Sequence, residues 1–309
     1  MDRFTRFHTL LLREWMQHRT GWLVLMALPT LLMLGLSLLD GQGLAVDGDN
    51  EVHIGQLSQQ PLVLQTLGWS VATAGLALLL VGLTVLAQLP GLARRDQQDR
   101  SIEFWRSLPI SHVQGSGATV LMHLLLLPAA VVTAALLGAQ LVALLFIVLH
   151  HGPLAWLQQP WGLLLPSLLL GALRLWLGLL LGVLWLSPLL LLTMAASAWL
   201  KRWAVPVVVA VSMLGTFWLD KRLPVPLVGP AFRRIGTEAL YALLAPDLFD
   251  GPRRLMQGDM LTAVQGLPTA LIQDILRVLA SAATPAFLVA LAGGALGFAL
   301  LVLRRQRTE

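Results

Sequence analysis

Long apolar stretches without acidic residues dominate this chain of 309 residues. Six such stretches contain no Asp or Glu. A helix needs about 20 apolar residues to cross a hydrocarbon core of roughly 30 Å. The pattern therefore predicts an all-α integral membrane protein with six transmembrane helices. The predicted spans cover residues 22–39, 62–93, 113–149, 162–200, 204–219 and 285–303.

Composition supports lipid as the solvent of this fold. Hydrophobic residues make up 57% of the chain and charged residues 12%, whereas soluble domains carry about 25% charged residues. The net charge of +5 is compatible with nucleic-acid binding, but the positions of the basic residues indicate membrane topology instead. The chain has no cysteine, which excludes disulfides and thiolate metal sites.

Basic residues cluster at alternate span ends. Residues 1–21 and 94–112 each contain four arginines, while residues 40–61 and 150–161 contain no Lys or Arg. Loops rich in Lys and Arg stay on the cytoplasmic side of a membrane. Six crossings with both termini in the cytoplasm satisfy this rule. The segment 220–284 then lies outside, although its length exceeds the range in which the rule is reliable.

Two spans raise questions of length and charge. Residues 162–200 would form a helix of roughly 57 Å, which either projects from the membrane or breaks at Pro166 or Pro188. Arg174 should lie at or beyond the outer headgroups, where it reaches water. His123 should lie at mid-depth or shallower, and we expect it to hydrogen-bond a neighbouring helix rather than a substrate.

Three segments outside the spans show helical patterns. Residues 3–20 have apolar side chains at three- and four-residue spacing with arginines on other faces. This predicts an amphipathic helix along the inner leaflet, with a disordered basic tail as the alternative. Residues 231–245 and 259–281 predict short helices on the outer leaflet or dipping into it. They could form an extracytoplasmic gate or simply cap the bundle.

The segment between spans two and three mixes charged and aromatic residues. Ile102, Phe104, Trp105 and Leu108 would give one apolar side to a short helix within residues 94–112. An exposed apolar cluster on the cytoplasmic side indicates a docking site for a partner. Burial of the same side chains in the membrane interface explains them equally well.

Motifs for catalysis and ion coupling are missing from the sequence. A phosphate-binding loop needs a glycine-rich turn ending in Lys and Ser or Thr, and neither Lys201 nor Lys221 fits it. There is no zinc-protease motif and no nucleophile elbow. Ion-coupled transporters place ionisable residues within their spans, and here only His123 and Arg174 occur there. We therefore expect no enzymatic activity in this chain.

Small residues recur at helical spacing in three spans. Gly68, Gly75 and Gly82 repeat every seven residues, and G-x-x-x-G motifs begin at Gly178 and Gly293. Such residues allow close helix approach. Packing within one subunit is the favoured interpretation for most of them.

Together these features resemble the ABC type-2 permeases, the membrane subunits of one class of ATP-binding-cassette exporters. The likeness covers the whole topology and is carried by residues 10–22, by the long segment before span six and by residues 99–117. In the last of these, an acidic residue precedes a Ser-Leu-Pro turn and a second serine, Ser111. The chain departs from the family at His112, where a basic residue is usual, and at residues 115–117, where a lysine commonly opens span three.

The resemblance implies a function and a set of partners. Two membrane subunits, here expected to be identical copies, would pair with two ATPase subunits in a bacterial cytoplasmic (inner) membrane. The chain itself would bind no cofactor, since ATP and Mg²⁺ would lie on the ATPase. Nucleic acid is not an expected partner. The coupling helix would contact the ATPase through Glu103, Phe104, Trp105, Arg106, Ser107, Leu108 and Pro109.

Two other functions stay open at the level of sequence. One is a non-transporting membrane scaffold or sensor that recruits a cytoplasmic partner. The other is a secondary transporter, against which the nearly uncharged spans count. An adjacent ATPase gene would favour the exporter, and an adjacent signalling kinase would favour the scaffold. The lack of charge in the spans indicates a hydrophobic or amphipathic substrate.

Overall fold

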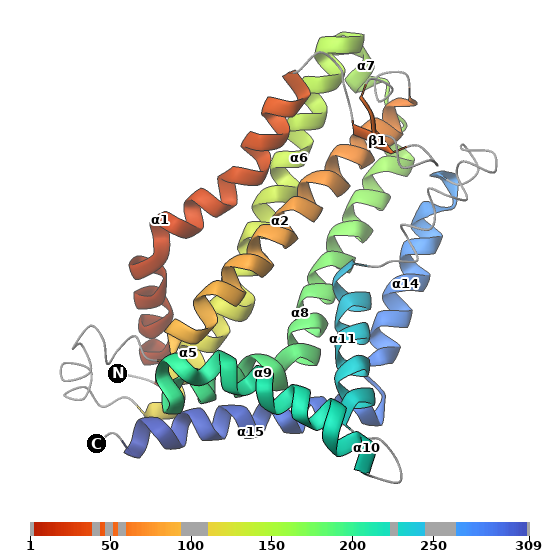
Figure 1. The fold of residues 1–309 in the computed structure, drawn as a ribbon. Helices are drawn as coiled ribbons and strands as arrows, with labels where there is room; N and C mark the ends of the chain where they lie inside the picture. Colours follow the sequence, from red (N-terminus) through yellow and green to blue (C-terminus); the bar gives the residue numbers. More distant parts are fainter. Residues whose placement is uncertain are drawn as a thin grey trace.

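The computed structural model describes residues 3–38, 44–46, 52–54, 60–93, 111–222, 228–244 and 264–307. These residues are almost entirely helical (Figure 1). The elements are α1 (Arg3–Leu38), β1 (Leu44–Val46), β2 (Val52–Ile54), α2 (Leu62–Leu92), α5 (His112–Leu121), η2 (Met122–Leu126), α6 (Leu127–His151), α7 (Pro153–Leu157), α8 (Trp161–Leu200), η3 (Lys201–Trp203), α9 (Ala204–Leu214), η4 (Gly215–Leu219), α10 (Asp220–Arg222), α11 (Val228–Leu244), α14 (Leu267–Ser281) and α15 (Pro285–Arg307).

Five helices are long and apolar enough to cross a membrane. They cover Thr5–Leu38, Leu62–Leu92, His112–His151, Trp161–Leu200 and Pro285–Arg307. The prediction of a helical, multi-pass membrane protein is therefore confirmed. One strand pair, in which β1 lies antiparallel to β2 with Leu44 opposite Ile54, departs from the all-α expectation.

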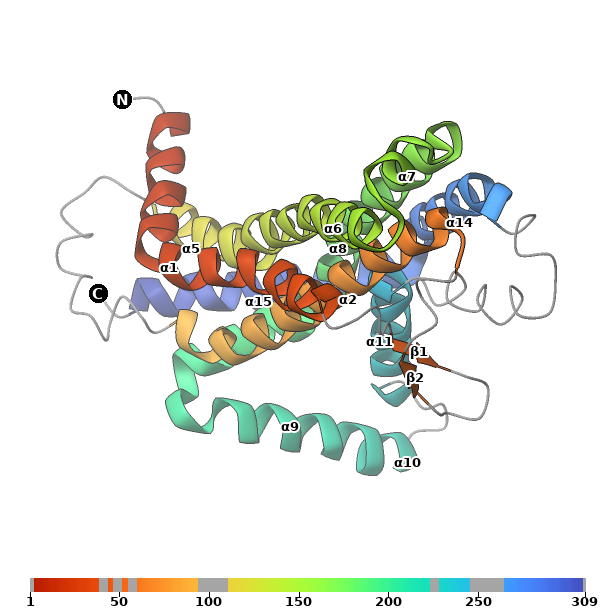
Figure 2. The same cartoon turned by 90° about the horizontal axis from the view of Figure 1, so that it is seen from above.

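The predicted span 204–219 does not form one regular helix. It is divided into α9, the π-helical η4 and α10, and none of these is among the five spanning helices. Figure 2 shows α9 running apart from the other long helices. Apolar side chains of α9 and of η4 are correspondingly exposed, as at Val211 in α9 (62%) and Phe217 in η4 (62%). Six crossings thus remain a prediction, of which the structure supports five.

Helix α8 packs against α2, α11, α14 and α15 and so lies at the centre of the helical assembly. It runs for 40 residues with Pro166 and Pro188 inside it, so of the two alternatives, a long continuous helix or a break at a proline, the structure has the continuous helix. A proline within a membrane helix leaves a backbone carbonyl without its usual hydrogen bond. Neighbouring helices and local adjustments of the backbone can satisfy that carbonyl, so the helix continues through the proline. At 1.5 Å per residue the helix is about 60 Å long, which leaves ample length beyond a single crossing.

Helices α14 and α15 follow α8 in the same direction, one after the other. Just past the middle of α8, Trp185 approaches the end of α14, where its Nε1 lies 3.4 Å from Ser281 Oγ. In the second half, glycines of α15 lie against residues 187–192. The Nε of Arg304 then donates to the Ala198 carbonyl at 3.3 Å. The turn between α14 and α15 therefore lets one long helix support two consecutive partners.

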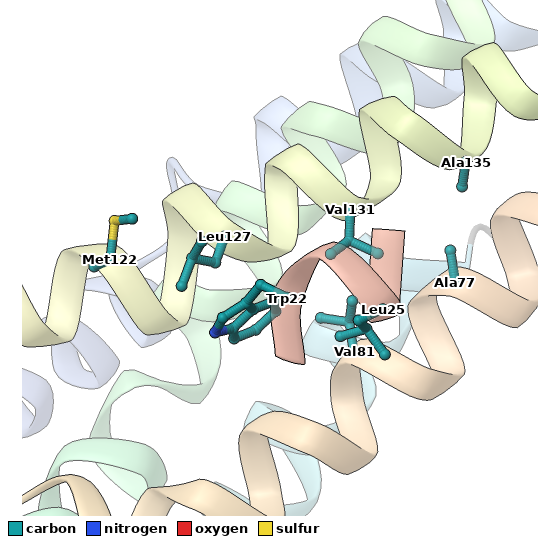
Figure 3. Close-up of a cluster of buried hydrophobic side chains, with 8 residues drawn as sticks. All are labelled: Trp22, Leu25, Ala77, Val81, Met122, Leu127, Val131 and Ala135. Atoms are coloured by element: carbon teal, nitrogen blue, oxygen red, sulfur yellow. The ribbon is translucent and has the colours of Figure 1, made fainter. Parts of the chain in front are cut away.

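Helices α1, α2 and α6 form the other half of the bundle. Their contact is an apolar cluster of Trp22, Leu25, Ala77, Val81, Met122, Leu127, Val131 and Ala135 (Figure 3). Trp22 is 1% exposed and lies at the point where the three helices meet. Ala77 on α2 and Ala135 on α6 face each other at the other end of the cluster from Trp22, and their small side chains let the two helices approach closely. Packing of this kind, rather than hydrophobicity alone, holds helices together in lipid.

The amphipathic pattern of residues 3–20 forms helix, and this helix continues into the first apolar stretch. The two together make α1, which has 36 residues. Figures 1 and 2 both show α1 bending along its length. The start of α1 and the end of α15 lie at the same end of the molecule. The position of residues 3–20 in a leaflet stays a prediction.

The two helices predicted in the segment 220–284 are present as α11 and α14. Both pack against α8, so they are part of the helical assembly rather than detached surface helices. The start of α11 is fixed by Asp220, whose carboxylate accepts from the Val228 N–H at 2.9 Å and the Gly229 N–H at 2.6 Å. An aspartate bonded to the first free N–H groups also favours the positive end of the helix dipole.

Glycine packing gives a first test of the fold. A methyl group on Gly297 would lie 2.8 Å from Leu192 N, so Gly297→Ala should destabilise the contact of α15 with α8 by about 1–3 kcal/mol. A methyl group on Gly75 meets nothing within 4 Å. Gly75→Ala should instead stabilise α2 by up to about 1 kcal/mol, because alanine favours helix. Denaturation in detergent, followed by tryptophan fluorescence, measures both. Equal effects would contradict the packing.

Candidate functional site

The predicted docking residues, Glu103 to Pro109, lie outside the described residues, which stop at Ala93 and resume at Ser111. The structure describes the two ends that carry this segment. The helix before it is α2 and the helix after it is α5. Both belong to helices of spanning length, so a force on residues 94–110 would act on two spans at once.

Ser111, the second serine of the motif, is the N-cap of α5. Its Oγ accepts from the Gln114 N–H at 3.2 Å, and Gln114 Oε1 accepts from the Ser111 N–H at 3.4 Å. This reciprocal arrangement is a capping box. The serine therefore has a structural role: it fixes where the spanning helix begins after the predicted coupling segment.

Arg305, at the end of α15, lies against the beginning of α5. Its Nη1 donates to Ser116 Oγ at 3.3 Å, and the same atom is 3.3 Å from the position of a methyl group on Gly115. Glycine at residue 115 thus leaves room for a guanidinium from another helix. This places a cation beside the first turns of α5. Sequence spacing could not reveal this contact, since 189 residues separate the partners.

Arg174 is buried, and the expectation that it reaches water is wrong. It is 2% exposed, and its Nε donates to Oδ2 of Asp274, which is 8% exposed. Helices α8 and α14 are thus joined by an ion pair within an apolar contact. A buried charge is tolerated only with a partner and further hydrogen bonds. The expectation failed because it considered α8 alone in a membrane, without the helices that cover it.

The rest of the Arg174 guanidinium binds the end of α11. Its Nη1 donates to the Ala242 carbonyl at 2.6 Å and its Nη2 to the Tyr241 carbonyl at 2.9 Å. The last carbonyls of a helix have no partner within that helix. The planar, five-donor guanidinium is suited to bind a carboxylate and two carbonyls together. Arg174 therefore connects three helices; we call Arg174, Asp274 and these two carbonyls the arginine junction.

Two glycines of α8 make room for this junction. A methyl group on Gly178 would overlap the Ala242 carbonyl oxygen, and one on Gly182 would lie 2.7 Å from Leu243 Cγ. The G-x-x-x-G motif at these residues thus packs against α11 of the same chain, as predicted. The motif at Gly293 and Gly297 does so as well, against α8.

Asp274 was not predicted as a partner of Arg174, although the sequence carried a signal for it. The residues of α14 that face inward are Leu271, Asp274, Ile275 and Val278. Their spacing of three and four places the carboxylate on the apolar face of an amphipathic helix. An acidic residue at such a position requires a buried basic partner. Arg174 is the basic residue inside a span that could meet this need.

A second polar network joins α2 to α6, in the part of α6 that is far from α5, and to Gln159 just before α8. Thr66 Oγ1 donates to Gln159 Oε1 at 2.9 Å, and Gln140 Nε2 donates to Ser70 Oγ at 3.0 Å. His151 Nε2 lies 3.0 Å from Gln65 Nε2. The adjacent histidines of the sequence are therefore divided, since His150 stacks on Phe146 at 4.3 Å between ring centroids. Hydrogen bonding between helices accounts for this network.

Comparison with protein-family models, with curated proteins and with solved structures finds no match. The likeness to ABC type-2 permeases therefore depends on the residues and topology described above.

The arginine junction predicts a strong effect of a single substitution. Arg174→Met should destabilise the protein by about 3–5 kcal/mol, because Asp274 is left buried without its charged partner. Arg174→Met with Asp274→Leu should lose less, since no unpaired charge remains. Tryptophan fluorescence during denaturation in detergent measures both.

Gln273→Met provides the control, because Gln273 is exposed on the same helix as Asp274. Its effect should stay within about 0.5 kcal/mol. If Arg174→Met matched this control, or if the double substitution were the more harmful one, the ion pair would not be what holds these helices together.

The capping box gives a local test. Ser111→Ala removes the acceptor for the Gln114 N–H, and loss of such a cap destabilises a helix end by about 0.5–2 kcal/mol. Hydrogen exchange of the amides in residues 112–115 should then accelerate roughly two- to thirty-fold. Ser111→Asp retains an acceptor and should exchange like the wild type. Equal acceleration in both variants would show that the cap is not responsible.

Proposed function

We propose that the chain is the transmembrane permease subunit of an ATP-driven ABC exporter. The observation that carries this proposal is the link between two long apolar helices, α2 and the α5–α6 unit, through a charged and aromatic segment. The sequence contains no phosphate-binding loop of its own. A partner ATPase that binds this segment would supply the energy for transport through ATP hydrolysis.

The packing supports a route from that segment into the bundle. Leu89 near the end of α2, Leu124 in η2, Met194 of α8 and Leu301 of α15 belong to one buried cluster. A pull on residues 94–110 would therefore act on α2 and α5 and, through these side chains, on α8. Packed side chains between rigid helices can carry such coupling.

The arginine junction supports a role for the segment 220–284 in the same movement. Arg174 attaches both α11 and α14 to α8. Any tilt of α8 would carry these helices with it. In the proposed orientation, with both termini cytoplasmic in a bacterial inner membrane, they would form the extracytoplasmic gate. Alternating access would then connect movement at the ATPase to opening at the far side.

The proposed substrate is a hydrophobic or amphipathic molecule taken from the cytoplasm or the inner leaflet. Only His123 and Arg174 are ionisable within the predicted spans, and Arg174 is bound to Asp274. Substrates with several charges would require compensating charges along their route. A second membrane subunit, a further copy of this chain, would complete the pathway.

The alternative is a membrane scaffold that binds a cytoplasmic protein without transport. The same apolar residues of segment 94–112 would serve it, so an energy-dependent activity must separate the two. The closely packed, nearly uncharged helices argue against the third candidate, a secondary transporter.

Co-purification tests the exporter. The protein should be expressed with the products of neighbouring genes, solubilised in detergent and isolated by a tag on this chain. An ATPase of the ATP-binding-cassette type should co-purify and hydrolyse ATP. The double substitution Trp105→Ala and Leu108→Asp should reduce the bound ATPase at least about tenfold, as expected for loss of central apolar anchors.

Trp156→Ala with Leu157→Asp is the matched control, since these residues lie in the short helix α7 at the opposite end of α6. It should leave the ATPase bound. If Trp105→Ala with Leu108→Asp leaves the amount of co-purified ATPase unchanged, the docking site lies elsewhere on this chain. If no ATPase binds under any condition, the scaffold becomes the better description.

A further inference from the structure

Three metal-ligating side chains from distant parts of the sequence meet at the interface of α1 and η2. They are Glu14, His18 and His123, and one possible ligand atom from each lies within 4.8 Å of the others. Glu14 and His18 are four residues apart on α1 and so share one helix face. Glu14 is 4% exposed and His123 is 1% exposed. Buried carboxylate and imidazole groups in an apolar bundle require a specific reason.

His123 is held in an orientation suited to metal binding. Its Nδ1 lies 3.1 Å from the Thr119 carbonyl oxygen. An imidazole that donates from Nδ1 to a carbonyl keeps Nε2 as the nitrogen able to bind a metal, an arrangement common among metal ligands. The ring of His18 packs against it edge to face, with 4.7 Å between ring centroids. The two imidazoles, one from α1 and one from η2, are therefore in direct contact.

The backbone around His123 is unusual. Residues Met122–Leu126 form a π-helical turn, in which the Leu127 N–H bonds back to the Met122 carbonyl. Pro128 follows directly; it lacks an N–H and crowds the preceding turn. Such π-helical turns occur frequently at functional sites because they redirect side chains. Here the turn carries His123 toward α1.

Glu14 is positioned by two hydrogen bonds. Its Oε1 accepts from Arg13 Nη2 at 3.0 Å and from Thr119 Oγ1 at 3.2 Å. Its Oε2 lies 3.9 Å from His123 Nδ1. Because Arg13 offsets the charge of the carboxylate, hard cations such as Mg²⁺ gain little at this point. Two imidazoles and one carboxylate oxygen suit zinc.

A cavity adjoins the cluster on the side of α2. It has a volume of about 230 Å³, and Gln17, His18, Trp22, Thr84 and Gln88 are among its lining residues. Trp22 Nε1 and Gln88 Oε1 are buried without a hydrogen-bond partner among the described residues. Polar atoms around a cavity of this size can bind water. Water could supply the remaining position of a four-coordinate ion.

We propose that Glu14, His18 and His123 form a binding site for Zn²⁺ or a similar divalent transition metal. Zinc binds nitrogen and oxygen ligands at about 2.0–2.2 Å, so small rotations of these side chains would complete the site. The bound ion would fasten α1 to η2 and thus to the helix that continues into α6. The proposal does not depend on the exporter, since it concerns only contacts within this chain.

Zinc uptake by the full chain in detergent tests the site. The wild type should bind one Zn²⁺ per chain by calorimetry and should not bind Mg²⁺. His18→Ala and His123→Ala should each weaken Zn²⁺ binding at least about tenfold. Zinc should also raise the temperature of thermal unfolding of the wild type, but not of these variants.

Two controls isolate the site from other histidines. His8→Ala removes an exposed imidazole from the same helix, and His150→Ala removes one of the adjacent pair at the other end of α6. Both should bind Zn²⁺ within twofold of the wild type. Because His123 is buried, the partly exposed His18 provides the variant least harmful to folding. The proposal is overturned if the wild type takes up no Zn²⁺, or if His18→Ala binds it like His8→Ala.

Discussion

The interaction on which this architecture most depends is the arginine junction. A guanidinium within apolar packing is stable only when its charge and donors are all matched. Asp274 supplies the opposite charge and accepts from Nε, and the carbonyls of Ala242 and Tyr241 accept from Nη1 and Nη2. Two of these three partners are backbone atoms at a helix end, so the junction fixes the position of α11 as well as its presence. Removal of any one partner would leave another buried polar group unsatisfied.

Around this point, α8 acts as a common support. It contacts α11 and α14 from Arg174 to Trp185 and α15 nearer its end, and glycines at Gly178, Gly182, Gly294 and Gly297 permit the close approaches. Since lipid offers no hydrophobic gain for helix association, contact area and hydrogen bonds must supply the stability. Helices α11 and α14 are therefore attached to α8. The proposed exporter mechanism uses this rigidity to link the two ends of the molecule.

Polar groups concentrate at a few helix contacts and are scarce elsewhere. The Glu14, His18 and His123 cluster joins α1 to η2, and the network of Gln65 and His151 joins α2 to the end of α6. Each contact connects helices that are distant in sequence. These contacts fix the register of helices that apolar packing alone would leave free to slide, because a polar group displaced from its partner in lipid finds no other.

The sequence by itself determined the class of protein, five of the spanning helices and the presence of α11 and α14, because hydropathy and helical spacing are local properties. It also indicated that the glycine motifs of α8 and α15 pack within the chain. Only the tertiary structure decided that Arg174 is buried, that Arg305 reaches the start of α5, and that His123 meets Glu14. These facts depend on contacts between residues about 100 or more positions apart. Local patterns cannot specify which helix covers a side chain, and burial decides what a charged group in lipid can do.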